Sequence, residues 1–524
     1  MDIAAILIQS SEKMKLVKKL TFLSVLLILS MFANGQYSVF FAIWIFIPLL
    51  LFAVRQVKRW QGFLLAFVVI TTGYYIGFDV VPFLPVAASL MIASIFGLFA
   101  TIPYFVDSFF EKQRASFLST LIFPTAVVLM EYGYHLLNAY GTWGHFAYTQ
   151  ESQTMLLQSV SVFGMGYITF LIAWFASVVN WVYEHRNDLR KIKKGSLVYA
   201  SVLAITLIFG GQRTLLQQEN PTTVRIASIS ALDSLNAMVD IPRLNNKETA
   251  HEAKIQARLN TSKLNTYLFD KSIAEAKAGA NLVFWAEGSG VILKEDETKF
   301  YEQASDIAAK HDFYLGVAMA VIDPSNPKFL ENKFVVFNKK GEKVMDYWKG
   351  ISVPGVEAPI SNNKATGIQK IETEYGTIAG AICFDMDFPD YLKQAKGADI
   401  LLSPSRDWKE IDPIHTDMTR FRAIEQGFNF IRQTSNGLTI GTDYTGKVLR
   451  EMDHFTDESK VMVTQLPTQG TTTVYSMIGD SFIAFCALVL IFVVVILKSK
   501  KRIPSRIKRK TSNETILGRV VETF

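Results

Sequence analysis

The sequence has 524 residues, enough for two or more domains, and half of them are hydrophobic. So high an apolar content is unusual for a soluble globular protein and indicates a part embedded in a membrane. The net charge is +6, but the basic residues stand in short clusters between apolar runs and in the tail 498–510. That pattern is typical of membrane loops, so we expect no nucleic-acid partner.

Eight apolar runs are long enough to cross a bilayer. Seven precede residue 212 and one lies near the C-terminus: 18–34, 37–54, 60–78, 84–107, 117–138, 155–183, 196–211 and 479–497. The first run lacks a small-residue cleavage site, so we expect an uncleaved span and not a signal peptide. We therefore expect seven transmembrane helices in 1–219, an extracytoplasmic domain in 220–472, and an eighth helix with a basic cytoplasmic tail in 473–524.

The loops between these runs alternate in charge and so predict an orientation. Basic loops alternate with loops that lack Lys and Arg: the basic ones are 13–19, 55–59, 111–114 and 184–194, and the others are 34–36, 79–83 and 138–153. The positive-inside rule then places both termini in the cytoplasm. The domain 220–472 lies on the outer face of the membrane in this arrangement.

The chain contains two cysteines, Cys383 in the outer domain and Cys486 in the eighth run. No disulfide can therefore form within the outer domain. No Cys/His cluster has the spacing of a zinc site, so we expect no structural metal.

Residues 220–472 alternate strand patterns with helical patterns, which predicts an α/β domain with mixed sheets. Three ionisable residues end strands or hairpin arms there: Glu287 after LVFWA, Lys349 after VMDYW and Cys383 after AGAI. Rigid strand ends often present catalytic side chains to a cleft. Each residue also has a simpler interpretation, a buried ion pair for Glu287 and Lys349 and a core thiol for Cys383.

The order Glu, Lys, Cys on strand ends of an α/β domain resembles the nitrilase, or carbon–nitrogen hydrolase, superfamily. That resemblance implies a four-layer αββα sandwich. Eight spans with the α/β domain between the seventh and the eighth resemble the apolipoprotein N-acyltransferases, the membrane branch of this superfamily. The resemblance covers nearly the whole chain and rests on the segments YWKGISVPGVE, AICFDMDFP, FRAIEQGFNFIRQTSNG and GTWGHFAYTQ.

Some positions depart from the family pattern. Phe384-Asp385 stands where the family has Tyr-Glu, the segment SPSRDW replaces Ser-Asn-Asp-Ala-Trp, and Ala286 replaces a proline before Glu287. These differences leave the three ionisable residues in place. They bear on which acyl donor and acceptor are used.

The resemblance implies ping-pong acyl transfer through a thioester on Cys383. A thiol must lose its proton to attack an acyl carbon, and Glu287 suits a general base that later returns the proton. Lys349 favours the thiolate and, with the backbone N–H after Cys383, stabilises the oxyanion. Glu357 orients Lys349 or the acceptor.

The resemblance further implies a phospholipid donor and, as acceptor, the N-terminal amine of a diacylglyceryl-cysteine lipoprotein, with no cofactor and a monomeric enzyme. Phe384 and Asp385 are supporting residues beside the nucleophile, and Trp143, Tyr148 and Trp408 are candidates for substrate contact. Two alternatives stay open. One is a membrane-anchored amidase or hydrolase with water as acceptor, and the other is a non-catalytic transporter or binding protein.

Other ionisable residues have mainly structural interpretations. His415 is an alternative partner for Cys383, but it lies in a predicted helix and Lys349 already fills that role. Glu131 and His135 lie one turn apart in the fifth run, where a structural hydrogen bond is as reasonable as a function. Arg406 and Asp407, next to Trp408, line the mouth of the cleft or pack as a loop.

Overall fold

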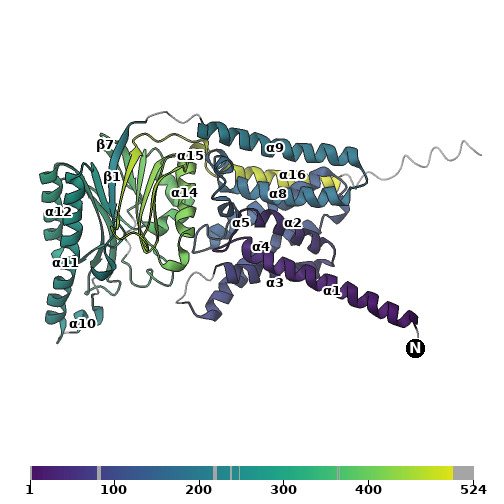
Figure 1. The fold of residues 1–524 in the computed structure, drawn as a ribbon, viewed down its shortest axis with the longest axis horizontal. Coiled ribbons are helices and arrows are strands. Elements are labelled where there is room, and N and C mark those ends of the chain that lie inside the picture. The colour runs from purple at the N-terminus through teal and green to yellow at the C-terminus, as the bar shows by residue number, and fades with distance from the viewer. Residues whose placement is uncertain are drawn as a thin grey trace, which may run out of the picture.

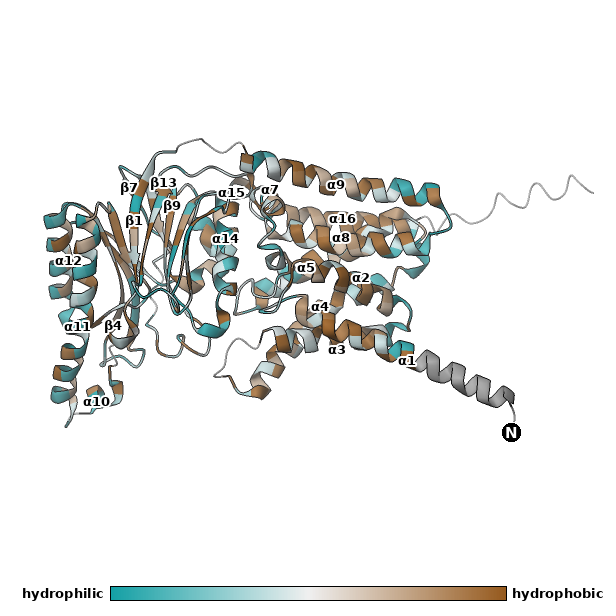
Figure 2. Cartoon of the chain, in the orientation of Figure 1, coloured by the Kyte–Doolittle hydropathy of each residue, from teal (hydrophilic) through white to brown (hydrophobic). Residues whose placement is uncertain are grey.

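The computed structural model describes residues 3–78, 84–215, 221–235, 239–246, 248–362, 364 and 366–499, with side chains from residue 17 onward except that of Asp233. The predicted outer loop 79–83, the predicted boundary near 219–220 and the tail beyond residue 499 lie outside this range. The chain forms a group of apolar helices beside a two-sheet α/β part (Figure 1). Figure 2 shows that brown, hydrophobic residues dominate the helices, whereas hydrophilic residues cover much of the α/β part.

The helical part contains most of the predicted spans. Its long helices are α1 (Ile3–Phe32), α2 (Ala42–Arg55), α3 (Arg59–Gly77), α4 (Val86–Ser108), α5 (Ile122–Leu137), α8 (Met165–Glu184), α9 (Leu189–Leu215) and α16 (Ser481–Ser499). Among the described residues, six helical stretches are long and apolar enough to cross a membrane: α3, α4, α5 with the 3-10 turn before it, α8, α9 and α16. The predicted second run forms α2, which has 14 residues and is shorter than a usual span.

The predicted sixth run, 155–183, is not one helix. It divides into α6 (Thr154–Leu157), α7 (Val160–Phe163) and α8, which begins at Met165. Gly164 lies between the last two with φ of +70°, a backbone conformation that glycine adopts without a steric penalty. The prediction therefore placed the start of this span about ten residues too early.

The α/β part contains two sheets. The first has the strand order β13 (Val461–Pro467), β1 (Thr223–Ile229), β2 (Leu282–Trp285), β4 (Tyr314–Ile322), β5 (Leu330–Phe337) and β6 (Lys343–Trp348), with β3 (Gly290–Leu293) paired to β4. The second has the order β12 (Val448–Asp453), β11 (Leu438–Thr442), β10 (Asn429–Ser435), β9 (Ile400–Arg406), β8 (Gly376–Gly380) and β7 (Lys370–Thr373). Parallel and antiparallel pairs occur in both, so the sheets are mixed, as predicted.

Helices cover the outer faces of both sheets. Figure 1 shows α11 (Ala250–Lys277) and α12 (Glu297–His311) on the first sheet, with the small helix α10 (Ile241–Asn245) below them. On the second sheet α14 (Ile414–Gln426) faces the membrane helices, accompanied by the short helices α13 (Pro389–Leu392) and α15 (Val474–Ile478). One buried apolar cluster between the sheets includes Phe284 and Phe334 of the first and Leu402 of the second. The predicted αββα sandwich is confirmed.

Helix α14 connects the two parts. Its residues Phe421 and Ile424 are fully buried and pack into the apolar cluster of the membrane helices. On the same helix Glu425 accepts a hydrogen bond from the backbone N–H of Met165 at 3.1 Å, at the N-terminus of α8. The second sheet is therefore attached directly to the membrane part through α14.

Candidate active site

The three predicted site residues lie at strand ends of both sheets. Glu287 follows β2, and Lys349 directly follows β6 in the first sheet. Cys383 follows β8 of the second sheet and begins a short 3-10 helix, Cys383–Asp387. All three side chains are almost completely buried, and all three line one cavity.

Lys349 is held by two carboxylates. Its Nζ atom lies 2.7 Å from Glu287 Oε1 and 2.6 Å from Glu357 Oε2. Burial opposes the charge of Lys349, but Glu287 and Glu357 raise its pKa well above the ordinary value, so the side chain stays an ammonium. A fixed ammonium suits this place because its charge and its donors are available to a developing anion.

Asn332 completes this charged group. Its Nδ2 atom donates hydrogen bonds to Glu287 Oε1 at 2.7 Å and to Glu357 Oε1 at 2.9 Å. Its backbone carbonyl accepts a hydrogen bond from the Lys349 N–H at 3.0 Å. Asn332 thus fixes the spacing of both carboxylates, a role that sequence reasoning missed. The available signal was a short polar segment, Glu331-Asn332-Lys333, inside the otherwise apolar strand β5.

Cys383 has the backbone conformation of a sharp turn. Its φ is +48°, which is uncommon for a residue other than glycine and occurs often at functional sites. The thiol contacts the backbone carbonyl of Arg406, with 3.6 Å between Sγ and O. Burial, and next the charge of Glu287, raise the pKa of the Cys383 thiol well above its usual range. The resting group is therefore a thiol that needs a base.

Asp385 joins the turn Cys383–Asp387 to the segment that follows Lys349. Its carboxylate accepts hydrogen bonds from Tyr347 Oη at 2.5 Å, Ile351 N at 2.8 Å and Ile382 N at 2.9 Å. Burial raises its pKa to about 7, although these hydrogen bonds oppose the shift. The neighbouring ring of Phe384 packs edge-on against Phe388, with 5.2 Å between centroids. Both supporting residues thus hold the turn in place.

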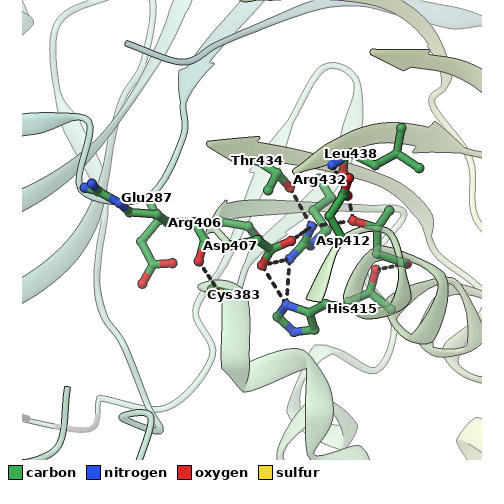
Figure 3. A network of polar contacts seen from close by, with 12 residues as sticks. Glu287, Cys383, Arg406, Asp407, Asp412, His415, Arg432, Thr434 and Leu438 are labelled. Atoms are coloured by element: carbon green, nitrogen blue, oxygen red, sulfur yellow. Dashed lines mark hydrogen bonds and ion pairs between the residues drawn. The ribbon is translucent and has the colours of Figure 1, made fainter. Parts of the chain in front are cut away.

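A second charged group lies beside Cys383. Figure 3 shows Asp407, Arg432 and His415 on one side of Cys383 and Glu287 on the other. Arg432 donates to Asp407 Oδ1 at 2.8 Å and to Oδ2 at 2.9 Å, and His415 Nδ1 lies 2.8 Å from Asp407 Oδ1. Cys383, Asp407 and His415 each place one atom that could bind a metal ion within 4.8 Å of the other two. The guanidinium of Arg432 already supplies a positive charge at this place, next to Asp407.

The cavity connects the membrane helices to Cys383. It has a volume of about 760 Å³. Tyr74 and Tyr75 of α3 and Ile92 and Ala93 of α4 line one part, and Glu287, Lys349 and Cys383 line another, together with Trp143, Trp408 and His415. One cavity thus reaches from residues of α3 and α4 to the Cys383 thiol.

Comparisons with known proteins match both parts of the chain. The family model for carbon-nitrogen hydrolases matches residues 253–476, and the model for the N-terminal domain of apolipoprotein N-acyltransferases matches residues 24–178. The chain belongs to the apolipoprotein N-acyltransferase family. Together the two models match most of the membrane part and most of the α/β part.

Several curated apolipoprotein N-acyltransferases are similar over most of their length. The protein of Rickettsia typhi is 21% identical over 472 residues, which cover 82% of this chain and 89% of that relative. A protein of Treponema denticola named apolipoprotein N-acyltransferase 1 is 23% identical, and the match covers 86% of this chain and 90% of that relative. Among solved structures, an amidase from Nesterenkonia sp. is 15% identical with a TM-score of 0.39, covering 48% of this chain and 94% of the amidase.

In this member of the apolipoprotein N-acyltransferase family, the loop 138–153 after α5 contacts the turn Cys383–Asp387. Thr142 donates from N and Oγ1 to the Asp387 carbonyl at 3.1 and 2.9 Å, and Trp143 Nε1 donates to Asp387 Oδ2 at 3.0 Å. Tyr148 lies outside the set of described residues that line the cavity. It accepts a hydrogen bond from Arg422 of α14 at 3.1 Å, so it joins the loop to the α/β part. Trp143 and Trp408, in contrast, do line the cavity.

Glu131 has a structural place in this fold. Its carboxylate accepts hydrogen bonds from Phe146 N at 2.8 Å and Thr169 Oγ1 at 2.7 Å. It therefore fixes the outer loop to α5 and α8. His135 lies 3.7 Å from Asp390, at the contact between α5 and the α/β part. The structural interpretation of this pair is supported.

Proposed function

We propose that this protein transfers an acyl chain from a phospholipid to the N-terminal amine of diacylglyceryl-cysteine lipoproteins, through a thioester on Cys383. The observation that carries the proposal is the cavity, which runs from α3 and α4 to a buried cysteine beside a lysine and two glutamates. A long acyl chain needs an apolar path out of the bilayer, and a thioester needs a nucleophile with a base and an oxyanion site. Both requirements meet at Cys383.

In the first half-reaction Cys383 attacks the ester carbonyl of the phospholipid. Glu287 takes the thiol proton, because the buried thiol holds it at rest. Lys349 and the backbone N–H of Phe384 stabilise the oxyanion that forms on the carbonyl. When the C–O bond breaks, Glu287 gives its proton to the leaving alcohol, and the lysophospholipid departs.

In the second half-reaction the free amine of the lipoprotein attacks the thioester carbonyl. Glu287 now accepts the amine proton and returns it to the Cys383 sulfur as the C–S bond breaks. Glu357 and Asn332 keep Lys349 in place through both steps, since they contact its charged end and its backbone. The products are an amide on the lipoprotein and the restored thiol.

The proposed placement in the bacterial inner membrane follows from loop charge. Residues 1–219 form the membrane part with seven crossings, residues 220–472 form the catalytic domain on the periplasmic face, and residues 473–524 return to the cytoplasm. In this placement the cavity opens at the level of the outer leaflet, where both lipid substrates reside. Cysteine accessibility labelling of the loop 184–194 in intact cells tests it, and labelling from outside contradicts it.

Transfer in a purified system tests the proposed function. The full-length enzyme is incubated with phospholipid and a diacylglyceryl-cysteine peptide, and the products are identified by mass spectrometry. The proposal predicts N-acyl peptide and lysophospholipid in equal amounts. Release of free fatty acid at the same rate with and without the peptide favours the alternative, a hydrolase with water as acceptor.

A further inference from the structure

The mechanism above leaves the buried group around His415 without a role. His415 is buried in α14 and lines the same cavity as Cys383. One of its ring nitrogens, one oxygen of Asp407 and the Cys383 sulfur lie within 4.8 Å of one another. A charge at that distance in a buried site affects the ionisation of a thiol substantially.

Both ring nitrogens of His415 face carboxylates. Nδ1 lies 2.8 Å from Asp407 Oδ1, and Nε2 lies 3.2 Å from Asp387 Oδ1. Nδ1 also lies 2.9 Å from Nη2 of Arg432. The two carboxylates, Asp387 and Asp407, carry two negative charges. Arg432 balances one of them, and a proton on His415 balances the other. Although burial and Arg432 oppose it, Asp387 and Asp407 raise the pKa of His415 to about 9. His415 is therefore an imidazolium near neutral pH.

The outer loop of the membrane part fixes this arrangement. Trp143 Nε1 donates to the other oxygen of Asp387 at 3.0 Å, and the Trp143 ring lies 5.8 Å from the His415 ring. Asp387 thus keeps one oxygen for the tryptophan and one for the imidazolium. The position of His415 is determined by both halves of the molecule.

We propose that His415 is a positioning residue that supplies a positive charge to the Cys383 thiolate, in addition to Lys349 and Arg432 and on the side away from Glu287. The charged groups that face Cys383 are then Glu287 after β2, Lys349 after β6, Asp407 after β9, Arg432 on β10 and His415 on α14. Lys349 also contacts two glutamates, so its single charge is shared between them and the thiolate. The imidazolium of His415 therefore adds to the stabilisation of the negative charge on the Cys383 sulfur.

The proposal rests on the nucleophilic role of Cys383 but is tested without acyl transfer. Full-length protein in the Cys486→Ala background has a single cysteine, and the rate of its alkylation by iodoacetamide reports thiolate formation. The rate is measured between about pH 6 and pH 10. His415→Gln and His415→Asn are two neutral variants whose amides replace Nε2 and Nδ1, respectively. His454→Gln, at a buried histidine of the same cavity, is the matched control.

The proposal predicts that both His415 variants react about tenfold more slowly than the parent near pH 7, since an adjacent charge shifts a thiol pKa by about one unit or more. The difference in alkylation rate between the parent and the variants disappears as the pH rises through about 9, where the parent loses its imidazolium proton. The control reacts at the parent rate. Equal rates in parent and His415 variants, or a difference that does not change with pH, overturn the proposal. A parent thiol that never reacts, and never carries an acyl group, contradicts the proposed function instead.

Discussion

The side-chain amide of Asn332 donates a hydrogen bond to Glu287 at 2.7 Å, and the same nitrogen donates to the second glutamate of the site. Asn332→Leu keeps the approximate volume but removes the amide that, together with Lys349 Nζ, donates to both carboxylates. Losing such a buried bond costs about 1–3 kcal/mol, so we expect a tenfold to hundredfold lower kcat. Steady-state acyl transfer measures the change. A variant with unchanged kcat contradicts the positioning role.

Glu357→Gln is expected to weaken the hold on Lys349. The change removes one of the two negative charges that face the ammonium, at 2.6 Å, while it keeps the shape of the side chain. We expect roughly a tenfold to hundredfold slower formation of the acyl-enzyme, from a single-turnover assay. Glu331→Gln is the matched control, because Glu331 is also buried and paired with lysines, yet it neighbours Asn332 on β5 and so points to the opposite face. Equal losses in both variants contradict a specific role for Glu357.

A large side chain in the cavity near the membrane helices is expected to block entry of the lipid without changing the reactivity of the Cys383 thiol. Ser89 of α4 lines the cavity, so Ser89→Trp places a large ring in the path from the bilayer to Cys383. We expect at least a tenfold drop in acyl transfer with an unchanged rate of Cys383 alkylation by iodoacetamide. The exposed residue Ile95 on the same helix gives the control variant Ile95→Trp. Normal transfer by Ser89→Trp contradicts the proposed path.

The proton on His415 predicts a pH-dependent stability. Its folded pKa of about 9 lies above the ordinary 6.5, so the folded state binds this proton more tightly than the unfolded chain. The stabilisation is complete below about pH 6.5 and is lost as the pH rises through about 9. Relative to His415→Gln, the free energy of unfolding of the parent should fall by about 3 kcal/mol across that window. Denaturant unfolding in detergent at several pH values checks this, and parallel pH curves contradict it.

The sequence allowed the strand ends to be predicted because each is a local pattern. LVFWAE, VMDYWK and AGAIC each combine a strand pattern with one reactive residue at its end, and the structure places all three side chains on one cavity. The layered fold was also predictable, since the alternation of strand and helix patterns and the resemblance to nitrilases agree. The break at Gly164 was not, because a glycine within an apolar run is also common in packed helices.

Contacts between distant segments were not predictable from one sequence. Asn332 meets Glu357 across 25 residues, and Trp143 meets Asp387 across 244. His415 was given a structural interpretation because it lies in a predicted helix and Lys349 already fills the role of partner for Cys383. Tyr148 was expected at the substrate, yet it bonds to Arg422 of α14, which lies 274 residues away in the chain. Such pairs depend on how the α/β part is seated on the membrane helices.

Intact-protein mass spectrometry tests the central claim, a thioester on Cys383, most directly. Wild type and Cys383→Ala are purified from membranes, incubated with phospholipid and weighed before and after hydroxylamine. If Cys383 forms a thioester, wild type alone gains the mass of one acyl chain and loses it with hydroxylamine. An unmodified wild type under these conditions, or the same adduct on Cys383→Ala, would contradict it.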